Sequence, residues 1–249
     1  MSHFSDVGFK VGGREDVVKL FNAIHSNAKL PKTVWEFDEH GTQYVIHYID
    51  DIRYISLVNY NKSQIQKVSL GHFNERLSRV NVITRLKDKE GSSDFDTLQV
   101  EKDGIPFWFS CGNVDIFNFK EGEELDIRIA SFAHYVEVKN ANMPIGNKDL
   151  EEIQSQEHIQ MADESYYSYW KDDQSMGFVS GIINNVKIKK NPLTKKHYYA
   201  VDVQCLGLNF AMLIDENLIK KNQLRPGKVL CGEFWNTALL VDEDNPERF

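Results

Sequence analysis

The chain has 249 residues, 41% of them hydrophobic and 27% charged, and its net charge at pH 7 is −8. This composition excludes a disordered chain, and a chain of this length buries roughly 70–75% of its unfolded surface without needing a metal or a disulfide. The acidic balance disfavours nucleic acid, whose non-specific binding depends on Lys and Arg, and favours a basic protein as partner.

The cysteines and the first residues indicate an intracellular protein. Cys111, Cys205 and Cys231 are too few and too far apart for a disulfide framework or a zinc site, so we expect three buried free thiols. Residues 1–6 lack the basic and apolar regions of a secretory signal, and no apolar run reaches the ~20 residues that cross a bilayer. We therefore expect a cytoplasmic protein with no membrane association and no cofactor.

Residues 1–70 are expected to form a small α+β unit. Apolar residues from Val17 to Ala28 recur at helical spacing on one face. Runs of β-branched and aromatic residues follow at 33–37, 42–48 and 53–60, separated by turn residues, which is typical of a meander of antiparallel strands. A helix followed by such a meander predicts an α+β arrangement with the helix on one face of the sheet.

The rest of the chain shows an internal duplication. Residues 71–139 can be aligned with residues 174–241 so that the turn Asp103-Gly104 falls on Leu206-Gly207, and a shift of two residues then places Gly122 on Gly227. The identities are few, and a chance match of alternating strand patterns is the competing interpretation. The alignment pairs Asn81 with Asn184, Leu98 with Val201, Val100 with Val203, Ile105 with Leu208, Phe107 with Phe210, Leu125 with Leu230 and Ile129 with Phe234.

The two copies, at residues 71–139 and 174–249, are each expected to form a small OB-like barrel. Five or so strands with a short helix before the fourth are the plan of this partly open barrel. Residues 113–119 and 216–223 are predicted to be the two short helices. An SH3-like or another small β-barrel fits the pattern nearly as well, because no diagnostic motif separates these folds.

Residues 140–173 are expected to be an acidic linker between the copies. Residues 149–161 are predicted to form an exposed helix with a narrow apolar edge. The run Tyr166-Tyr167-Ser168-Tyr169-Trp170 follows, and such a density of aromatic side chains rarely stays in water. We predict that this run packs on one of the barrels.

No catalytic or nucleotide-binding motif occurs in the sequence. The candidate for a metal or acid–base cluster is His47 with Asp50 and Asp51, because imidazole and carboxylate together can hold a divalent ion. Acidic pairs at hairpin tips are common without a ligand, so we favour a solvated turn and expect no metal. Paired carboxylates such as Glu123-Glu124 are likewise interpreted as solvated surface.

Aromatic and basic residues give the candidate binding surface. Phe107 and Phe109 share one face of a strand and Trp108 lies on the other, where an outward ring can stack a base or a sugar. Packing of Trp108 against another part of the chain is the favoured alternative. Lysines flank the turn at 191–194 and are interpreted as a solvated hairpin tip. The candidate binding residues are Trp108, Phe107, Phe109, Tyr167, Trp170, Trp235, Lys187 and Lys189.

Three hypotheses about function remain open. The first is a non-catalytic cytosolic binding protein, of regulatory or toxin-neutralising type, whose acidic surface engages a basic protein. The second is single-stranded nucleic-acid binding by the barrels, through Trp108 and the lysines. The third is an enzyme or small-ligand binder with a pocket near His47, Asp50 and Asp51.

Overall fold

The fold is described from a computed structural model of the chain. From residue 41 onward, the described part contains strands and turns and no helix. The residues that the structure describes are 8, 15–16, 19, 41–49, 52–73, 96–111, 122–141, 157–162, 165–170, 174–191 and 194–241. Its strands are β1 (Thr42–Ile49), β2 (Ile52–Tyr60), β3 (Ile65–Phe73), β4 (Asp96–Lys102), β5 (Ile105–Cys111), β6 (Glu124–Lys139), β7 (Glu157–Ala162), β8 (Ser165–Tyr169), β9 (Met176–Lys190), β10 (His197–Cys205), β11 (Leu208–Asp215) and β12 (Val229–Leu240).

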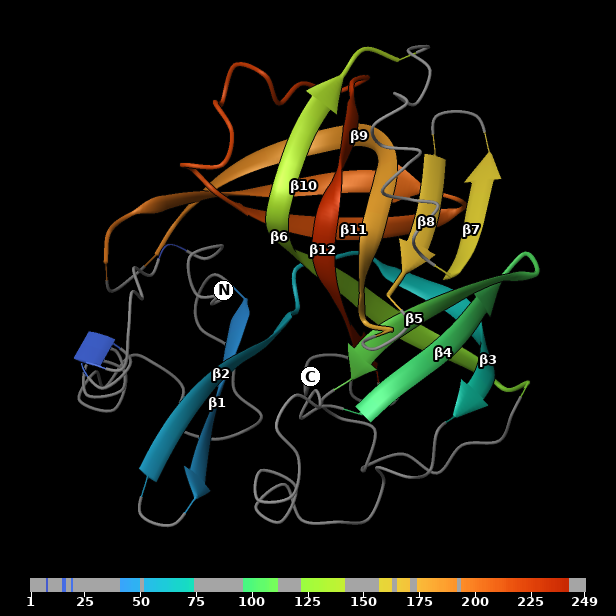
Figure 1. Cartoon of the computed structure of the whole chain (residues 1–249), viewed down its shortest axis with the longest axis horizontal. Helices are drawn as coiled ribbons and strands as arrows, with labels where there is room; N and C mark the ends of the chain where they lie inside the picture. Colours follow the sequence, from blue (N-terminus) through green and yellow to red (C-terminus); the bar gives the residue numbers. More distant parts are fainter. Residues whose placement is uncertain are drawn as a thin grey trace.

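β1 and β2 form a two-stranded hairpin, and all the other strands belong to one mixed sheet (Figure 1). The hydrogen bonds of this sheet pass around a ring of eight strands, in the order β10-β11-β6-β3-β4-β5-β12-β9 and back to β10. β8 pairs with β9 and β7 pairs with β8, outside the ring. An antiparallel pairing of β6 with β12 crosses the ring, so the ring is not an even barrel.

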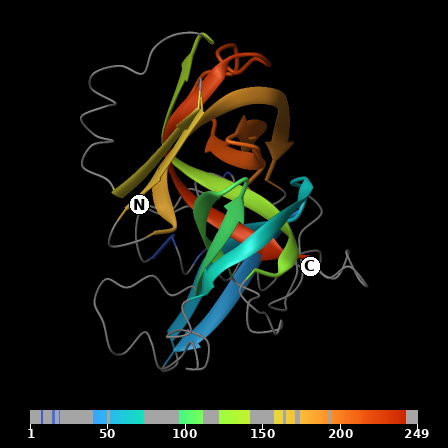
Figure 2. The same ribbon diagram turned by 90° about the vertical axis from the view of Figure 1, so that its right-hand side faces the viewer.

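This crossing pair divides the ring into two circuits of strands. The first circuit contains β3, β4, β5, β12 and β6, and the second contains β9, β10, β11, β6 and β12. In each circuit a three-stranded antiparallel meander ends in a parallel pairing, β5 with β12 in the first and β11 with β6 in the second. Figure 2 shows β9–β11 above β3–β5, with β6 and β12 running through both halves. The two long strands therefore belong to both circuits.

The hairpin turns of the two circuits have the same conformation. Asp103 and Gly104 have φ values of 53° and 78°, and Leu206 and Gly207 have φ values of 47° and 83°. Two successive positive φ values define the type I′ turn, whose twist matches that of two-residue β-hairpins. The sequence alignment places these two turns on each other, and the structure gives both the same geometry.

The pairing registers of the two circuits also agree. In the first circuit β3 occupies the position that β9 occupies in the second. The sequence alignment assigns this position to the segment around Asn81, which lies outside the described residues. β3 also spans the boundary that the sequence predicts at residue 70. Equivalent cross-strand pairs are Leu70–Val100 and Ile183–Val203, Val68–Leu125 and Gly181–Leu230, and Ser110–Thr237 and Leu213–Phe132.

One buried polar pair joins the two long strands β6 and β12. The register that aligns Leu125 with Leu230 also aligns Ser131 with Asn236, and these two residues pair with each other in β6 and β12. Both side chains are fully buried, and the Ser131 hydroxyl donates to Asn236 Oδ1 at 2.7 Å. The register therefore places Ser131 and Asn236 at equivalent positions of the two circuits.

A single core runs through both circuits. Phe107 and Phe109 of β5 are fully buried, and their ring centroids lie 6.3 Å and 6.1 Å from that of Phe210 on β11. Rings at this separation and tilt pack favourably beyond the area that they bury. The apolar interior is thus shared between the circuits, as the two long strands are.

Two glycines allow the long strands to approach their neighbours. A Cβ atom on Gly181 of β9 would lie 2.2 Å from the carbonyl oxygen of Gln204, and one on Gly232 of β12 would lie 2.0 Å from that of Tyr135. Real Cβ atoms do not come so close to backbone oxygen, so any larger residue would force the strands apart.

Several sequence predictions need correction. Residues 216–223 form separate turns and not a short helix: the Leu218 N–H donates to Asp215 O at 3.0 Å and the Gln223 N–H to Lys220 O at 2.9 Å. Bonds of this spacing close single turns, and no i→i+4 ladder follows them. The predicted helices at 17–28 and 113–119 lie outside the described residues.

The predicted linker also differs from expectation. The last residues of the helix predicted at 149–161 lie in β7, because β8 pairs with β9 and offers its free edge to a further strand. Two of the three runs predicted as a meander, 42–48 and 53–60, form β1 and β2, and the run at 33–37 lies outside the described residues. The described part of the chain is mostly β, and its main sheet is one mixed sheet to which both halves of the chain contribute, since each circuit uses a strand from the other half.

Candidate functional site

Three neighbouring strands of the first circuit, β4, β3 and β6, carry carboxylates on their outer face. Val68 and Leu70 of β3 are buried, so Ser69 between them points outward. Ser69 pairs with Glu101 of β4 on one side and with Glu124 of β6 on the other. The two glutamates therefore lie in one row across three strands, with Cα atoms about 10 Å apart.

Two more exposed carboxylates lie close to this row in the chain, Asp103 two residues after Glu101 and Glu123 immediately before Glu124. Asp103 lies in the β4–β5 turn, and Glu123 immediately precedes β6, where its carbonyl oxygen accepts a hydrogen bond of 2.8 Å from the Leu70 N–H. Like charges gathered on one surface repel each other and create a field that attracts cations. We refer to Glu101, Asp103, Glu123 and Glu124 as the acidic face.

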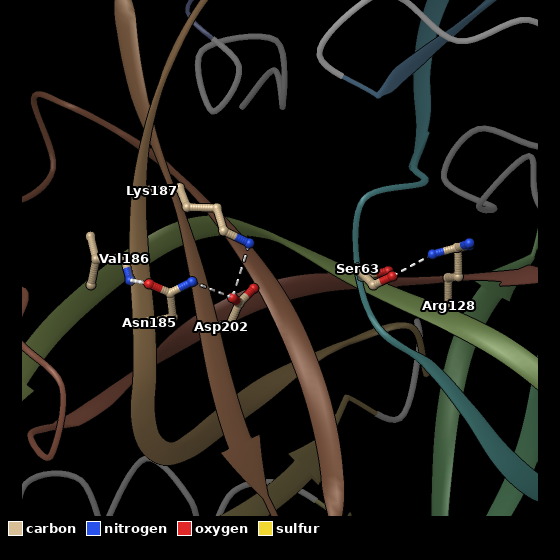
Figure 3. A network of polar contacts seen from close by, with 6 residues as sticks. All are labelled: Ser63, Arg128, Asn185, Val186, Lys187 and Asp202. Carbon is tan, nitrogen blue, oxygen red and sulfur yellow. Dashed lines mark hydrogen bonds and ion pairs between the residues drawn. The ribbon is translucent and has the colours of Figure 1, made fainter.

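Two basic side chains near the acidic face, Lys67 and Arg128, have partners outside it. Lys67 Nζ lies 3.9 Å from Asp126 Oδ1 across β3 and β6. Arg128 Nη1 donates to the carbonyl oxygen of Ser63 at 2.5 Å (Figure 3). Burial lowers the pKa of Arg128, although a guanidinium stays charged at neutral pH. Each of these two cations therefore has at least one partner outside the acidic face.

The second circuit provides an internal comparison for the acidic face. The positions equivalent to its carboxylates are buried or neutral, except for one lysine, and none is acidic. The same strands therefore form without carboxylates at these positions, so the fold does not require them. The equivalent residues are Gln204 for Glu101, Leu206 for Asp103, Lys228 for Glu123 and Val229 for Glu124.

The β9–β10 hairpin carries the opposite charge and lies on the other side of the molecule in Figure 1. Asp202 of β10 is its one carboxylate within the two strands. That carboxylate accepts a hydrogen bond from Asn185 Nδ2 at 3.1 Å and lies 3.4 Å from Lys187 Nζ (Figure 3). The lysine hairpin is defined by Lys187, Lys189, Lys190, Lys195 and Lys196.

Trp108 packs against the aromatic run that follows β7. It is 8% exposed, and its ring centroid lies 6.0 Å from that of Tyr169 on β8. The fully buried Tyr167 hydroxyl accepts a hydrogen bond from the Trp108 N–H at 2.9 Å and donates to the Trp108 carbonyl oxygen at 3.0 Å. Burial raises the pKa of Tyr167, so the hydroxyl keeps its proton. This arrangement leaves Trp108 little surface on which a base could stack.

The other predicted aromatic residues are mostly internal. Phe107 and Phe109 belong to the core. Trp235 is 6% exposed, donates from Nε1 to Ser110 Oγ at 3.1 Å and lies 5.4 Å from the Phe132 ring. Trp170 is 37% exposed, at the end of β8. The predicted aromatic residues therefore do not meet on one surface.

The predicted metal cluster of His47, Asp50 and Asp51 falls mostly outside the described part of the chain. Asp50 and Asp51 and the side chain of His47 lie outside the described residues, which fix only the pairing of His47 with Tyr54. Within the described ranges no group of His, Cys, Asp and Glu is placed to hold a metal ion. Cys111, Cys205 and Cys231 are buried and not joined in disulfides, as predicted.

The acidic face was missed at the sequence level. Glu101 and Glu124 are far apart in the chain and become neighbours only because β3 lies between β4 and β6. Their spacing carries no motif, and Glu123-Glu124 alone has the pattern of a solvated turn. Only the strand register reveals the cluster.

Comparison with known protein families, with curated proteins and with solved structures gives no match for this chain. In the described part of the chain, no helix is both long and apolar enough to cross a membrane.

Proposed function

We propose that this chain is a non-catalytic binding protein that engages a basic protein partner through the acidic face. The observation that carries the proposal is the contrast between the circuits, since the equivalent strands of the second circuit form without carboxylates. The fold does not need these carboxylates, and they repel each other. A cationic partner best explains why they are gathered on one surface. A field of this kind accelerates association and selects partners by charge.

The architecture supports a binding role of this kind. We propose that the chain arose by duplication and that each circuit is an OB-like barrel, in which the last strand of the other half supplies the fifth strand. The equal turns and equal registers of the two circuits support the duplication. A duplicated scaffold can lose or gain a surface in one copy while the other copy maintains the fold.

The experiment is capture of partners from the host lysate by the full chain at low salt, followed by elution at high salt and identification of the eluted proteins. We expect basic proteins that leave the column as salt screens the charges. The double variant Glu101→Gln, Glu124→Gln should reduce capture of these partners about tenfold, which corresponds to about 1.4 kcal/mol. The matched control Glu216→Gln, Glu233→Gln changes the net charge equally outside the acidic face and should retain capture.

Two results would overturn the proposal. One is that no protein is retained at low salt. The other is that both double variants lose capture to the same extent, because binding would then depend on net charge and not on the acidic face.

A further inference from the structure

β9 has one edge that no described strand covers along its second half. β12 pairs with β9 from Met176 to Ile182, and the turn before β12 bonds to Ile183. β10 pairs with the opposite edge as far as Lys190. Beyond Ile183, the side of β9 away from β10 therefore has no partner strand among the described residues.

The alternation of hydrogen bonds shows which main-chain groups face this edge. The Asn191 N–H donates to Lys196 O at 2.8 Å, so the alternate residues back along β9 direct their bonds toward β10. The groups of Lys190, Ile188 and Val186 then point away from β10. In agreement, the Val186 N–H donates to the side-chain oxygen Oδ1 of Asn185 at 2.9 Å. Ile188 and Lys190 thus present main-chain donors and acceptors to the outside.

The side chains along the same edge differ between its two faces. Ile188 lies on the face of Val186, which packs against the core, yet Ile188 itself is 45% exposed. Lys187 and Lys189 lie on the opposite face. The edge therefore combines main-chain hydrogen-bonding groups with an apolar side chain on one face and cations on the other.

We propose that this edge binds an extended acidic segment of a partner protein by strand addition. The segment would carry carboxylates at alternate positions, facing Lys187 and Lys189, and aliphatic residues between them, facing Ile188. Pairing with a second copy of the chain would bring these lysines together, and lysine on an edge strand is a common defence against such pairing. An acidic strand relieves the repulsion instead. This surface is separate from the acidic face, and the proposal does not depend on the proposed function.

The test uses the full chain and a fluorescent peptide of about eight residues in which Glu and Val alternate, with binding followed by anisotropy at low salt. We expect saturable binding, and slower hydrogen exchange at the amides of Ile188 and Lys190 in the complex. Ile188→Pro removes an outward N–H without breaking a bond to β10, and should weaken binding about tenfold with little change in thermal stability. Lys189→Glu should weaken binding as well, whereas the same charge change at Lys67 should not.

Three results would overturn this proposal. The first is no binding of the Glu-Val peptide, and the second is equal binding of a peptide in which Lys alternates with Val. The third is tighter binding of single-stranded oligothymidylate than of the acidic peptide, with loss on Lys189→Glu but not on Ile188→Pro. That third result would assign the lysine hairpin to nucleic acid, whose phosphates need the charge but not the strand edge.

Discussion

Replacing Tyr167 by Phe removes a hydroxyl that bonds to both main-chain groups of Trp108. The Trp108 N–H donates to this hydroxyl at 2.9 Å, and the hydroxyl donates to the Trp108 carbonyl oxygen at 3.0 Å. β12 pairs with β5 only at Ser110 and Cys111, so it does not reach this point of the strand. In the Tyr167→Phe variant both groups would stay buried without a partner.

The structure gives the size of the expected effect. A buried donor or acceptor without a partner costs about 1–3 kcal/mol, so the two groups of Trp108 together cost about 2–6 kcal/mol. We expect a loss of about 3–4 kcal/mol in the free energy of unfolding, because some water can reach the site in the variant. For a chain of this size the thermal midpoint should then fall by about 6–16 °C.

The assay is equilibrium unfolding in guanidinium chloride, followed by tryptophan fluorescence. The matched control is Tyr135→Phe, the same chemical change at a residue that is 50% exposed and donates to Glu137 Oε2 at 3.4 Å. This control should change stability by less than about 0.5 kcal/mol. Equal losses in the two variants would refute the bridging role of Tyr167.

Two further predictions concern the long strands and the buried thiol. Gly232→Ala should destabilise the protein by several kcal/mol or prevent folding, since its Cβ would lie 2.0 Å from Tyr135 O. The control Gly104→Asn fills open space at a φ that Asn accepts. A wild-type thermal midpoint for Gly232→Ala would contradict the close approach of β12 to Tyr135. Burial raises the pKa of the Cys205 thiol, so the folded protein keeps a proton that the unfolded chain releases above about pH 8.5. Stability should therefore be complete below that pH and fall as pH rises, by at most about 1.4 kcal/mol per pH unit from this thiol. Cys205→Ala should flatten the decline measured by unfolding at pH 9 to 11, and an unchanged slope would contradict the assignment.

Local rules made part of this fold predictable from the sequence. The turns Asp103-Gly104 and Leu206-Gly207 follow apolar alternation on both sides, and the structure gives both the same type I′ geometry. The burial of Phe107 and Phe109 on one face of β5 follows from the same period of two. Such features depend only on neighbours in the chain.

Features that depend on closure of the sheet could not be predicted. Alternation in the sequence predicts that β6 is a strand, but it does not show that β11 pairs with one edge of β6 and β12 with the other. The sequence predicts that the aromatic run at Tyr166–Tyr169 is packed, but its contact with Trp108 follows only from the pairing of β8 with β9. The candidate site is of the same kind, because Glu101 and Glu124 become neighbours through β3.

The exchange of long strands has a consequence for biosynthesis. β3, β4 and β5 leave the ribosome well before β12, yet their circuit closes only when β12 pairs with β5 and β6. Until β12 is synthesised, the edges of β5 and β6 that pair with it stay unpaired. The edge of β6 that pairs with β11 likewise stays unpaired until β11 is synthesised. Since neither circuit is closed before β12 is made, we expect the two circuits to be completed together and not one half at a time.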